Sequence, residues 1–418
     1  MTQLHKRFTD SQVQKLFDRY VKGEVRRKHV EAILEIGKSR FFESLKAYRE
    51  GRGKFSITYT RKKSTRGIGA GIEKNILKEL TIDKVLIMNP ATPVRAYNYS
   101  YIKNRLNKKY DQEVSLPTII NRAKREGYYL KKKQRKTHDR EVLTNYVGEL
   151  IQHDASYHMF APDTKKKWCL ITSLDDFSRY LLYAVLVERE NTWAHIQGLQ
   201  TVMVTYGFPV SYYVDCHSTF RFVRGRDELH YKHHLVTDES TPQWKQVLDD
   251  CRVKVTYALS PQAKGKIERP YQWIQDHVVR TCAREGVRDI KEARQVLKQE
   301  VGEYNHKRVH STTKEVPYIR FQRALRNKRS LFREFEIPKP YKSIRDVFCF
   351  RMTRTADGYR KIGINNIQFK VNKMNPRDTL DLRIYPISKL YSEVRFWREE
   401  ELLDIQKIKN TDLKRIIT

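Results

Sequence analysis

Three acidic residues occupy positions from which their side chains could serve phosphoryl transfer. Asp154 follows the apolar run 147–151, and Asp215 follows the apolar run 210–214. Both runs predict buried strands, so each aspartate is expected at the end of a strand. Glu268 comes later, where a loop that contains Pro and Gly becomes a helix. If the two strands are neighbours, the three carboxylates can meet at one end of a sheet.

The intervals between these acids leave room for the elements that would bring them together. The residue numbers of Asp154 and Asp215 differ by 61 (215 − 154), and those of Asp215 and Glu268 differ by 53 (268 − 215). Carboxylate oxygens are hard ligands, which suit Mg²⁺ or Mn²⁺. Such ions activate the nucleophile and neutralise the charge that develops in phosphoryl transfer. Taken alone, each acid could equally be a solvated or capping carboxylate, and Asp175 and Asp176 compete for the same role.

The residues around Glu268 predict its place in a helix and a contact with DNA. Proline is tolerated in the first helical turn and breaks a helix interior, so Pro270 predicts a helix that begins near 265–267. Glu268 then lies in the first turn, where the helix dipole favours a charged carboxylate. The basic residues expected to hold DNA phosphates beside it are Lys264, Lys266 and Arg269.

An α/β layer is predicted to position these acids. Residues 145–285 contain apolar, partly alternating runs, with helix-like segments after the third, fourth and fifth runs. This order predicts helices packed on a mixed sheet. The expected strands are 147–151, 168–174, 180–187, 210–214 and 252–257, and the helices are 192–206, 243–248 and one from about 265. The polar, His-rich stretch 216–242 is expected to be a surface insertion in this core rather than a metal site.

Residues 1–52 predict a helix-turn-helix DNA-binding domain. Apolar residues recur at helical spacing from 9 to 50, and Gly37 and Gly51 end the second and third helical segments. The basic residues on the last helix are Arg40, Lys46 and Arg49. The alternative is a plain three-helix bundle with a solvated basic face.

Residues 72–130 predict a second helix-turn-helix domain. Ser115 can cap a helix that carries Pro117 in its first turn and runs to Glu126. One face of this helix presents side chains that can read base edges or bind phosphate, namely Thr118, Asn121, Arg122 and Arg125. A basic linker, 131–144, separates this region from the core.

The chain after the core is predicted to hold a basic helical segment (286–330), a small β-barrel (341–400) and a basic tail (401–418). Runs such as 347–350 and 367–371 are strand-like within the barrel region.

The distribution of charge predicts a nucleic-acid partner. The 418 residues carry 83 Lys and Arg against 49 Asp and Glu, a formal net charge of +34. Residues 1–140 hold 35 basic against 14 acidic residues, 141–285 hold 17 against 18, and 286–418 hold 31 against 17. Two basic regions therefore flank a near-neutral centre, which suits a packed core whose flanks bind a polyanion.

No membrane or secretory feature is visible in the sequence. It has no apolar run of 18 or more residues, and its N-terminus lacks a signal-peptide apolar core. The five cysteines form no close pair, which argues against a disulfide framework and a Cys-rich zinc module. These features predict a cytoplasmic protein with no membrane partner.

Five short motifs follow one another through the middle of the chain. They are His153-Asp154-Ala155-Ser156, Leu174–Tyr180, Val214-Asp215, Pro261–Arg269 and Tyr304–Ser311. Together they resemble the catalytic core of DDE transposases and integrases, and most of all bacterial insertion-sequence transposases with an integrase-type (rve) core. The resemblance covers about residues 140–325 closely. The predicted helix-turn-helix and β-rich ends fit the family's layout loosely.

The resemblance implies an RNase H-like fold in which Asp154, Asp215 and Glu268 form the metal-binding triad, with Mg²⁺ or Mn²⁺ as cofactor. It implies a polynucleotidyl transferase that binds terminal inverted repeats, cleaves at the 3′ ends of the element and joins them to target DNA. Its partners would be double-stranded DNA and further copies of the chain, at the nucleoid in a bacterial cytoplasm. Asp175 and Asp176 match a motif that is usually structural.

The chain departs from retroviral integrases in two respects. The interval between its second and third acids is longer, and it lacks their N-terminal His/Cys zinc module, so helix-turn-helix domains are expected to recognise the element ends. Two other interpretations are a non-catalytic DNA-binding regulator derived from a transposase and a structure-selective nuclease of the same fold. The complete acid trio favours an enzyme over the regulator, and two upstream helix-turn-helix units disfavour the nuclease.

Overall fold

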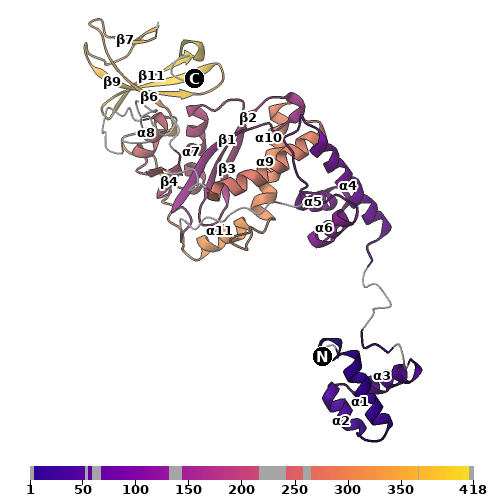
Figure 1. Cartoon of the computed structure of the whole chain (residues 1–418). Helices are drawn as coiled ribbons and strands as arrows, with labels where there is room; N and C mark the ends of the chain where they lie inside the picture. The colour runs from indigo at the N-terminus through magenta and orange to yellow at the C-terminus, as the bar shows by residue number, and fades with distance from the viewer. Residues whose placement is uncertain are drawn as a thin grey trace, which may run out of the picture. The chain divides into compact units, whose positions relative to one another are not determined.

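The computed structural model divides the chain into two compact units, Met1–Lys74 and Asn75–Thr418, which are described separately (Figure 1). It describes residues 4–51, 55–58, 67–130, 144–215, 242–257, 265–365 and 367–413, without the side chains of 265–269. Within these residues no helix is both long and apolar enough to cross a membrane.

Three helices make up most of the described first unit, as the periodicity predicts. They are α1 (Asp10–Val21), α2 (Arg27–Leu34) and α3 (Lys38–Glu50), after the short 3₁₀ turn η1 (Leu4–Lys6). Thr9 and Gln12 start α1 with a reciprocal capping box. The unit has a hydrophobic core of its own, in which the packed rings are Phe17, Phe41, Tyr48 and Phe55.

The second unit begins within a group of helices that precede the sheet. These are α4 (Ala70–Met88), α5 (Tyr99–Tyr110) and α6 (Leu116–Arg125). The Asn98 side chain caps α5, and the Ser115 side chain caps α6, which carries Pro117 in its first turn as predicted. The turn between α5 and α6 therefore starts at Asp111, the left-handed C-cap of α5, and ends at Ser115.

Buried ion pairs fasten α4 to the long helix α9 (Gly265–Glu285). Arg280 donates to Asp83 at 2.6 Å, and Arg284 pairs with both Glu79 and Asp83. All four side chains are at most 3% exposed. Charges buried to this degree are tolerated because each has an opposite partner. The second predicted DNA-binding region is thereby joined to the α/β core within one unit.

The described core contains a mixed five-stranded sheet. Its strands are β1 (Leu150–His158), β2 (Trp168–Asp175), β3 (Leu181–Val187), β4 (Ser211–Val214) and β5 (Lys254–Tyr257). The spatial order is β3-β2-β1-β4-β5; β2 is antiparallel to β1 and β3, whereas β4 is parallel to β1 and β5. The predicted mixed sheet is confirmed, and the arrangement fits the RNase H-like fold.

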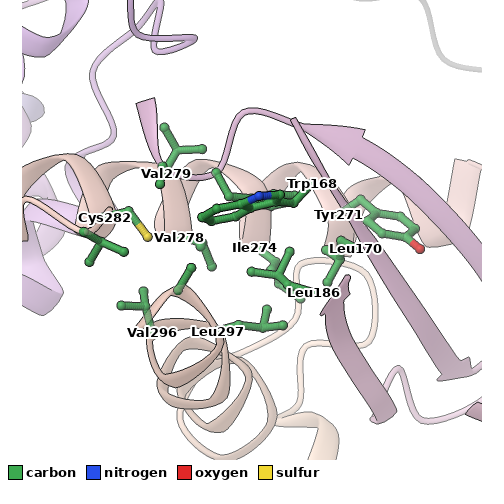
Figure 2. Close-up of a cluster of buried hydrophobic side chains, with 14 of the residues drawn as sticks. Trp168, Leu170, Leu186, Tyr271, Ile274, Val278, Val279, Cys282, Val296 and Leu297 are labelled. Atoms are coloured by element: carbon green, nitrogen blue, oxygen red, sulfur yellow. The ribbon is translucent and has the colours of Figure 1, made fainter. Parts of the chain in front are cut away.

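Helices cover both faces of this sheet. α7 (Thr192–Tyr206) and α8 (Gln243–Asp250) share one buried cluster with β1 and β4. α9 and α10 (Ile290–His306) pack on the other face, and α11 (Pro317–Arg326) contacts α10. Figure 2 shows the second cluster, where Ile274 and Val278 of α9 meet Trp168, Leu170 and Leu186 of the strands.

Asp154 lies inside a strand, so the prediction that it follows the end of one is wrong. β1 pairs with β4 as far as Gln152 and Tyr213, but its antiparallel pairing with β2 continues to His158 and Trp168. Hydrogen bonds to β2 therefore extend the strand through the polar residues that follow the apolar run. Asp154 consequently lies where β4 has ended and β1 continues.

A β-rich region follows the core. Its elements are α12 (Ile344–Val347), β6 (Phe350–Thr355), β7 (Lys361–Ile364), β8 (Ile367–Lys370), β9 (Thr379–Pro386), β10 (Tyr391–Arg398), β11 (Glu401–Lys409) and η5 (Asn410–Leu413). One sheet has the order β11-β10-β9-β6, and β7 pairs with β8. The predicted small barrel is not confirmed, because the described strands group into these two sheets.

Two details of this region differ from the sequence-based expectation. The run 347–350 is not a strand throughout, because a capping box between Ser343 and Asp346 starts the short helix α12 there. Residues 401–409, expected within a basic tail, form β11 and pair with β10. β11 is an edge strand with mostly polar or half-exposed residues, so it has no apolar run that would identify it.

Candidate active site

The parallel pairing of β1 and β4 sets the positions of Asp154 and Asp215. Gln152 pairs with Tyr213, and the difference between these residue numbers (213 − 152 = 61) is constant along the paired segment. The numbers of Asp154 and Asp215 differ by the same amount (215 − 154 = 61), and Asp215 lies directly after the end of β4. Neighbouring strands lie about 4.8 Å apart, so a continued register brings the two aspartates side by side.

Both aspartates belong to the sheet face that α9 covers. Side chains alternate between faces along a strand, so Asp154 shares its face with Ser156, and Asp215 shares its face with Tyr213. The Tyr271 hydroxyl of α9 donates to the Asp154 carbonyl oxygen at 2.5 Å, and the Gln275 amide of α9 donates to Ser156 Oγ at 2.8 Å. α9 therefore passes next to Asp154, and both aspartates are half-buried.

Glu268 lies in the first turn of α9, as predicted, although Pro270 is the sixth residue of the helix and lies inside it instead of in its first turn. The helix begins at Gly265, within the expected range, and Glu268 precedes Tyr271 by one turn. Helical periodicity puts positions 268, 271 and 275 on one side of α9. The side chains of Glu268, Lys266 and Arg269 lie outside the described part of the structure, as does the whole of Lys264.

A buried chain of hydrogen bonds anchors β1 on the face opposite to Asp154. His153 Nε2 lies 2.9 Å from His195 Nδ1 on α7, and His195 Nε2 lies 3.0 Å from Glu190 Oε1. The other ring nitrogen of His153 lies 2.9 Å from Ser173 Oγ on β2. Both histidines are fully buried. The residue next to Asp154 is thus tied to α7 and β2 from one face, while α9 holds Asp154 from the other.

Asp175 and Asp176, which compete with the triad in the sequence, are both buried: Asp175 is the last residue of β2, and Asp176 lies in the turn that follows it. The Asp175 carboxylate accepts from the backbone nitrogens of Gly148 and Ser178 and from Ser178 Oγ. Burial raises the pKa of the Asp175 carboxyl to about 6. Asp176 accepts from the Arg179 guanidinium at 2.9 Å. Both acids hold the turn together, which matches the structural role that the resemblance implies.

The donor set at the paired aspartates suits a hard divalent cation. Asp154 and Asp215 offer carboxylate oxygens from adjacent strands, the ligands that Mg²⁺ and Mn²⁺ prefer. Among the described side chains, no group of three or more His, Cys, Asp or Glu residues could hold an ion. The carboxylate oxygens of the two aspartates suit such a cation. The His-rich stretch 216–242 lies outside the described residues except for Pro242.

The candidate DNA-contacting residues of the described helices lie on their outer surfaces. α6 buries one side through Ile119 and Ala123. The candidates on the rest of α6 are half-buried or exposed: Thr118, Asn121, Arg122 and Arg125. The α3 candidates in the first unit are all exposed: Arg40, Lys46 and Arg49. A side chain must be accessible in this way if it is to contact DNA.

Sequence reasoning missed the residues that hold the acids in place. Tyr271 lies three positions after Glu268 on the same side of a helix, and that spacing could have drawn attention to it. His195 lies 42 residues from His153, and their hydrogen bond depends on how α7 packs on the sheet. No local pattern signals such a contact.

Two curated proteins are similar in sequence to this chain, although no family model matches it. The chain is 27% identical over 180 residues to "Putative transposase y4bF" of Sinorhizobium fredii, covering 43% of this chain and 38% of that protein. It is 26% identical over 172 residues to "Transposase for insertion sequence IS1202" of Streptococcus pneumoniae, covering 41% of this chain and 35% of that protein. The similarity thus spans little more than a third of each relative's length.

Two solved viral structures are also similar. One is the HTLV-2 integrase catalytic core domain in complex with magnesium, in its trimeric form; identity is 14%, the TM-score is 0.31, and the match covers 43% of this chain and 98% of that chain. The other is the simian T-cell lymphotropic virus intasome in complex with the PP2A regulatory subunit B56 gamma; identity is 14%, the TM-score is 0.33, and the match covers 70% and 91%. The fold assignment rests on the strand order and register of the core rather than on these distant likenesses.

The five motifs indicate a resemblance to transposases, and the two curated relatives confirm it, because both carry the name transposase. In sequence, the chain resembles the DDE transposase and integrase superfamily.

Proposed function

We propose that the chain is a DNA transposase, which cleaves the 3′ ends of an insertion sequence and joins them to target DNA. The β1–β4 register carries this proposal, because its offset in residue number equals the interval between Asp154 and Asp215. The sequence similarity to transposases points independently to the same class of reaction.

In this proposal, Asp154, Asp215 and Glu268 hold divalent metal ions with their carboxylate oxygens. Bound Mg²⁺ or Mn²⁺ would favour deprotonation of the attacking oxygen and neutralise charge on the reacting phosphate. Asp154 and Asp215 come from adjacent strands of a rigid sheet, and Glu268 comes from the first turn of a helix that packs on that sheet. The position of Glu268 at the start of this helix favours an ionised carboxylate, because the positive end of the helix dipole lies there.

The reaction consists of two phosphoryl transfers. In the first, water attacks the phosphodiester at the element end, which leaves a 3′-hydroxyl on the element and a 5′-phosphate on the flanking DNA. In the second, this 3′-hydroxyl attacks a phosphodiester of the target, forms a new phosphodiester and releases a target 3′-hydroxyl. One phosphodiester replaces another in the second step, so joining needs no external energy source.

Basic residues bring the DNA to the acids. Lys264, Lys266 and Arg269 surround Glu268 in sequence and bind phosphates of the reacting strand. α6 reads the terminal inverted repeats through its outer surface, and α3 adds a second contact surface. Because many phosphates are neutralised, binding weakens steeply as the salt concentration rises. An element has two ends, so a joining complex contains more than one copy of the chain.

A strand-transfer assay tests the proposal. The full chain is incubated with Mg²⁺, a duplex that carries the terminal inverted repeat found beside its gene, and a plasmid target. Joined products are expected in which the 3′ end of the repeat duplex is linked to a 5′ phosphate of the plasmid. Protection of the repeat from nuclease digestion without any joined product, at every metal concentration, would instead identify a regulator derived from a transposase.

End recognition is tested by substitution, because deleting α4 would expose the buried partners Arg280 and Arg284. Asn121 is exposed on α6, and Asn121→Ala is expected to weaken binding to the repeat by roughly 5- to 150-fold. Binding to a duplex of scrambled sequence serves as the control and should not change. Equal loss on both duplexes would show that Asn121 does not read sequence.

A further inference from the structure

The Tyr271 hydroxyl of α9 forms hydrogen bonds with both β1 and β2 next to the candidate site. It donates to the Asp154 carbonyl oxygen of β1 at 2.5 Å and accepts from Thr172 Oγ1 of β2 at 2.9 Å. The tyrosine is 5% exposed. Figure 2 shows its ring at the border of the hydrophobic cluster, with the hydroxyl directed away from the aliphatic side chains of α9. The ring packs like any core aromatic residue, whereas the hydroxyl makes a separate polar connection.

A second hydrogen bond between α9 and β1 lies one helical turn after Tyr271. Gln275 Nε2 donates to Ser156 Oγ at 2.8 Å, two residues along β1 from Asp154. Two such bonds at successive turns fix both the rotation of α9 about its axis and its height above β1. Position 268 lies on the same side of the helix, one turn before Tyr271. The two bonds therefore determine where the first turn of α9 stands relative to Asp154.

We propose that Tyr271 is a positioning residue for metal binding: its hydroxyl holds the Asp154 backbone and the first turn of α9 together, so that Glu268 completes the ligand set of Asp154 and Asp215. This inference rests on the proposed function. A few tenths of an ångström matter here, because Mg²⁺ binds only in near-ideal octahedral geometry. Without the bond, the three carboxylates would still be present but less well pre-organised.

The chain offers a matched control in Tyr304 of α10. Tyr304 is buried like Tyr271, and its ring packs against Trp273 of α9 with centroids 5.5 Å apart. Its hydroxyl has no hydrogen-bond partner among the described residues. Tyr304→Phe and Tyr271→Phe therefore remove the same atom from the same kind of environment, but only Tyr271→Phe removes a connection to Asp154.

The test is direct Mn²⁺ binding by the full chain, measured from the electron paramagnetic resonance signal of free Mn²⁺. Tyr271→Phe is expected to weaken Mn²⁺ binding roughly five- to tenfold, the effect of losing one hydrogen bond. Tyr304→Phe should match the wild type. Thr172→Val, which removes the donor to the Tyr271 hydroxyl, should give a smaller loss than Tyr271→Phe. In strand transfer, the Mg²⁺ concentration for half-maximal rate should rise by the same factor, while affinity for the repeat stays constant.

The possible results separate the two claims. Mn²⁺ binding that requires Asp154, as judged from Asp154→Asn, but is unchanged in Tyr271→Phe overturns the inference and leaves the proposed function intact. Equal weakening in Tyr271→Phe and Tyr304→Phe also overturns it, because the effect would then be a general loosening of the core. Wild-type binding no tighter than that of Asp154→Asn would overturn the proposed function and the inference together.

Discussion

The two ends of the central sheet each hold a pair of aspartates, and the surroundings of the pairs differ. Asp175 lies beside Ile151, where β1 begins, and Asp175 and Asp176 are at most 1% exposed. Asp154 and Asp215 lie where β4 ends, and both are half-buried. The residue type is the same, and each pair is associated with a strand end.

The difference shows what distinguishes a structural carboxylate from a candidate ligand. The oxygens of the buried pair accept hydrogen bonds from Ser178 and Arg179 of the turn and from Gly148, which precedes β1, and those bonds define the shape of the turn. A metal ligand must instead keep its oxygens within reach of an ion and of the substrate phosphate. Burial thus separates the two pairs, whereas residue type and spacing do not.

The largest effect on stability is expected at Asp176. Asp176→Ala leaves the Arg179 guanidinium, which is 6% exposed, without its ion-pair partner, and should destabilise the second unit by about 3–5 kcal/mol. All five tryptophans lie in this unit, so urea unfolding followed by tryptophan fluorescence reports on it. Asp163→Ala, at an exposed position, should change stability by less than about 0.5 kcal/mol. A similarly small change in Asp176→Ala would remove the distinction between the two pairs.

The next largest effect is expected in how stability changes with pH, which depends on Asp175. Its pKa is raised from 3.8 to about 6 by burial, so the folded state holds the proton more tightly than the unfolded state does. Protonated Asp175 stabilises the folded state relative to ionised Asp175. This contribution to the free energy of unfolding is complete below pH 3.8 and is lost as the pH rises through about 6. The stability of wild type relative to Asp175→Asn should therefore fall across this window, by on the order of 3 kcal/mol. Parallel unfolding curves for the two proteins at all pH values would argue against this account.

The smallest effect on stability is expected at the half-buried pair. Asp154→Asn and Asp215→Asn remove one of two adjacent like charges, so each should leave the second unit as stable as wild type or up to about 0.5 kcal/mol more stable. The same urea experiment measures this. Destabilisation as large as that of Asp176→Ala would mean that the pair holds the sheet together instead of remaining accessible to an ion.

Much of the core could be predicted because its signals are local. Apolar runs predict β2 and β3, the helix-like segment 192–206 predicts α7, and α9 begins within the predicted range although Pro270 lies inside it. The prediction ended β1 at Ile151 because the apolar run ends there, whereas pairing with β2 extends the strand to His158. β11 was missed because its residues are mostly polar or half-exposed.

The supports of the site could not be predicted because they join distant parts of the chain. Tyr271 reaches Asp154 across 117 residues, and Arg284 reaches Glu79 across 205. Such contacts follow from strand order and helix packing, which no local pattern contains. The acids themselves were accessible to sequence reasoning, because Asp154 and Asp215 follow apolar runs and all three acids lie in recognisable local motifs.

The most direct test of the triad compares strand transfer in the two classes of acid. Asp154→Asn, Asp215→Asn and Glu268→Gln should each abolish metal-dependent joining and leave affinity for the terminal repeat nearly unchanged, whereas Asp175→Asn should retain joining at temperatures where it is folded. Metal-dependent joining that persists in all three triad variants would contradict the assignment of these residues as the metal-binding triad.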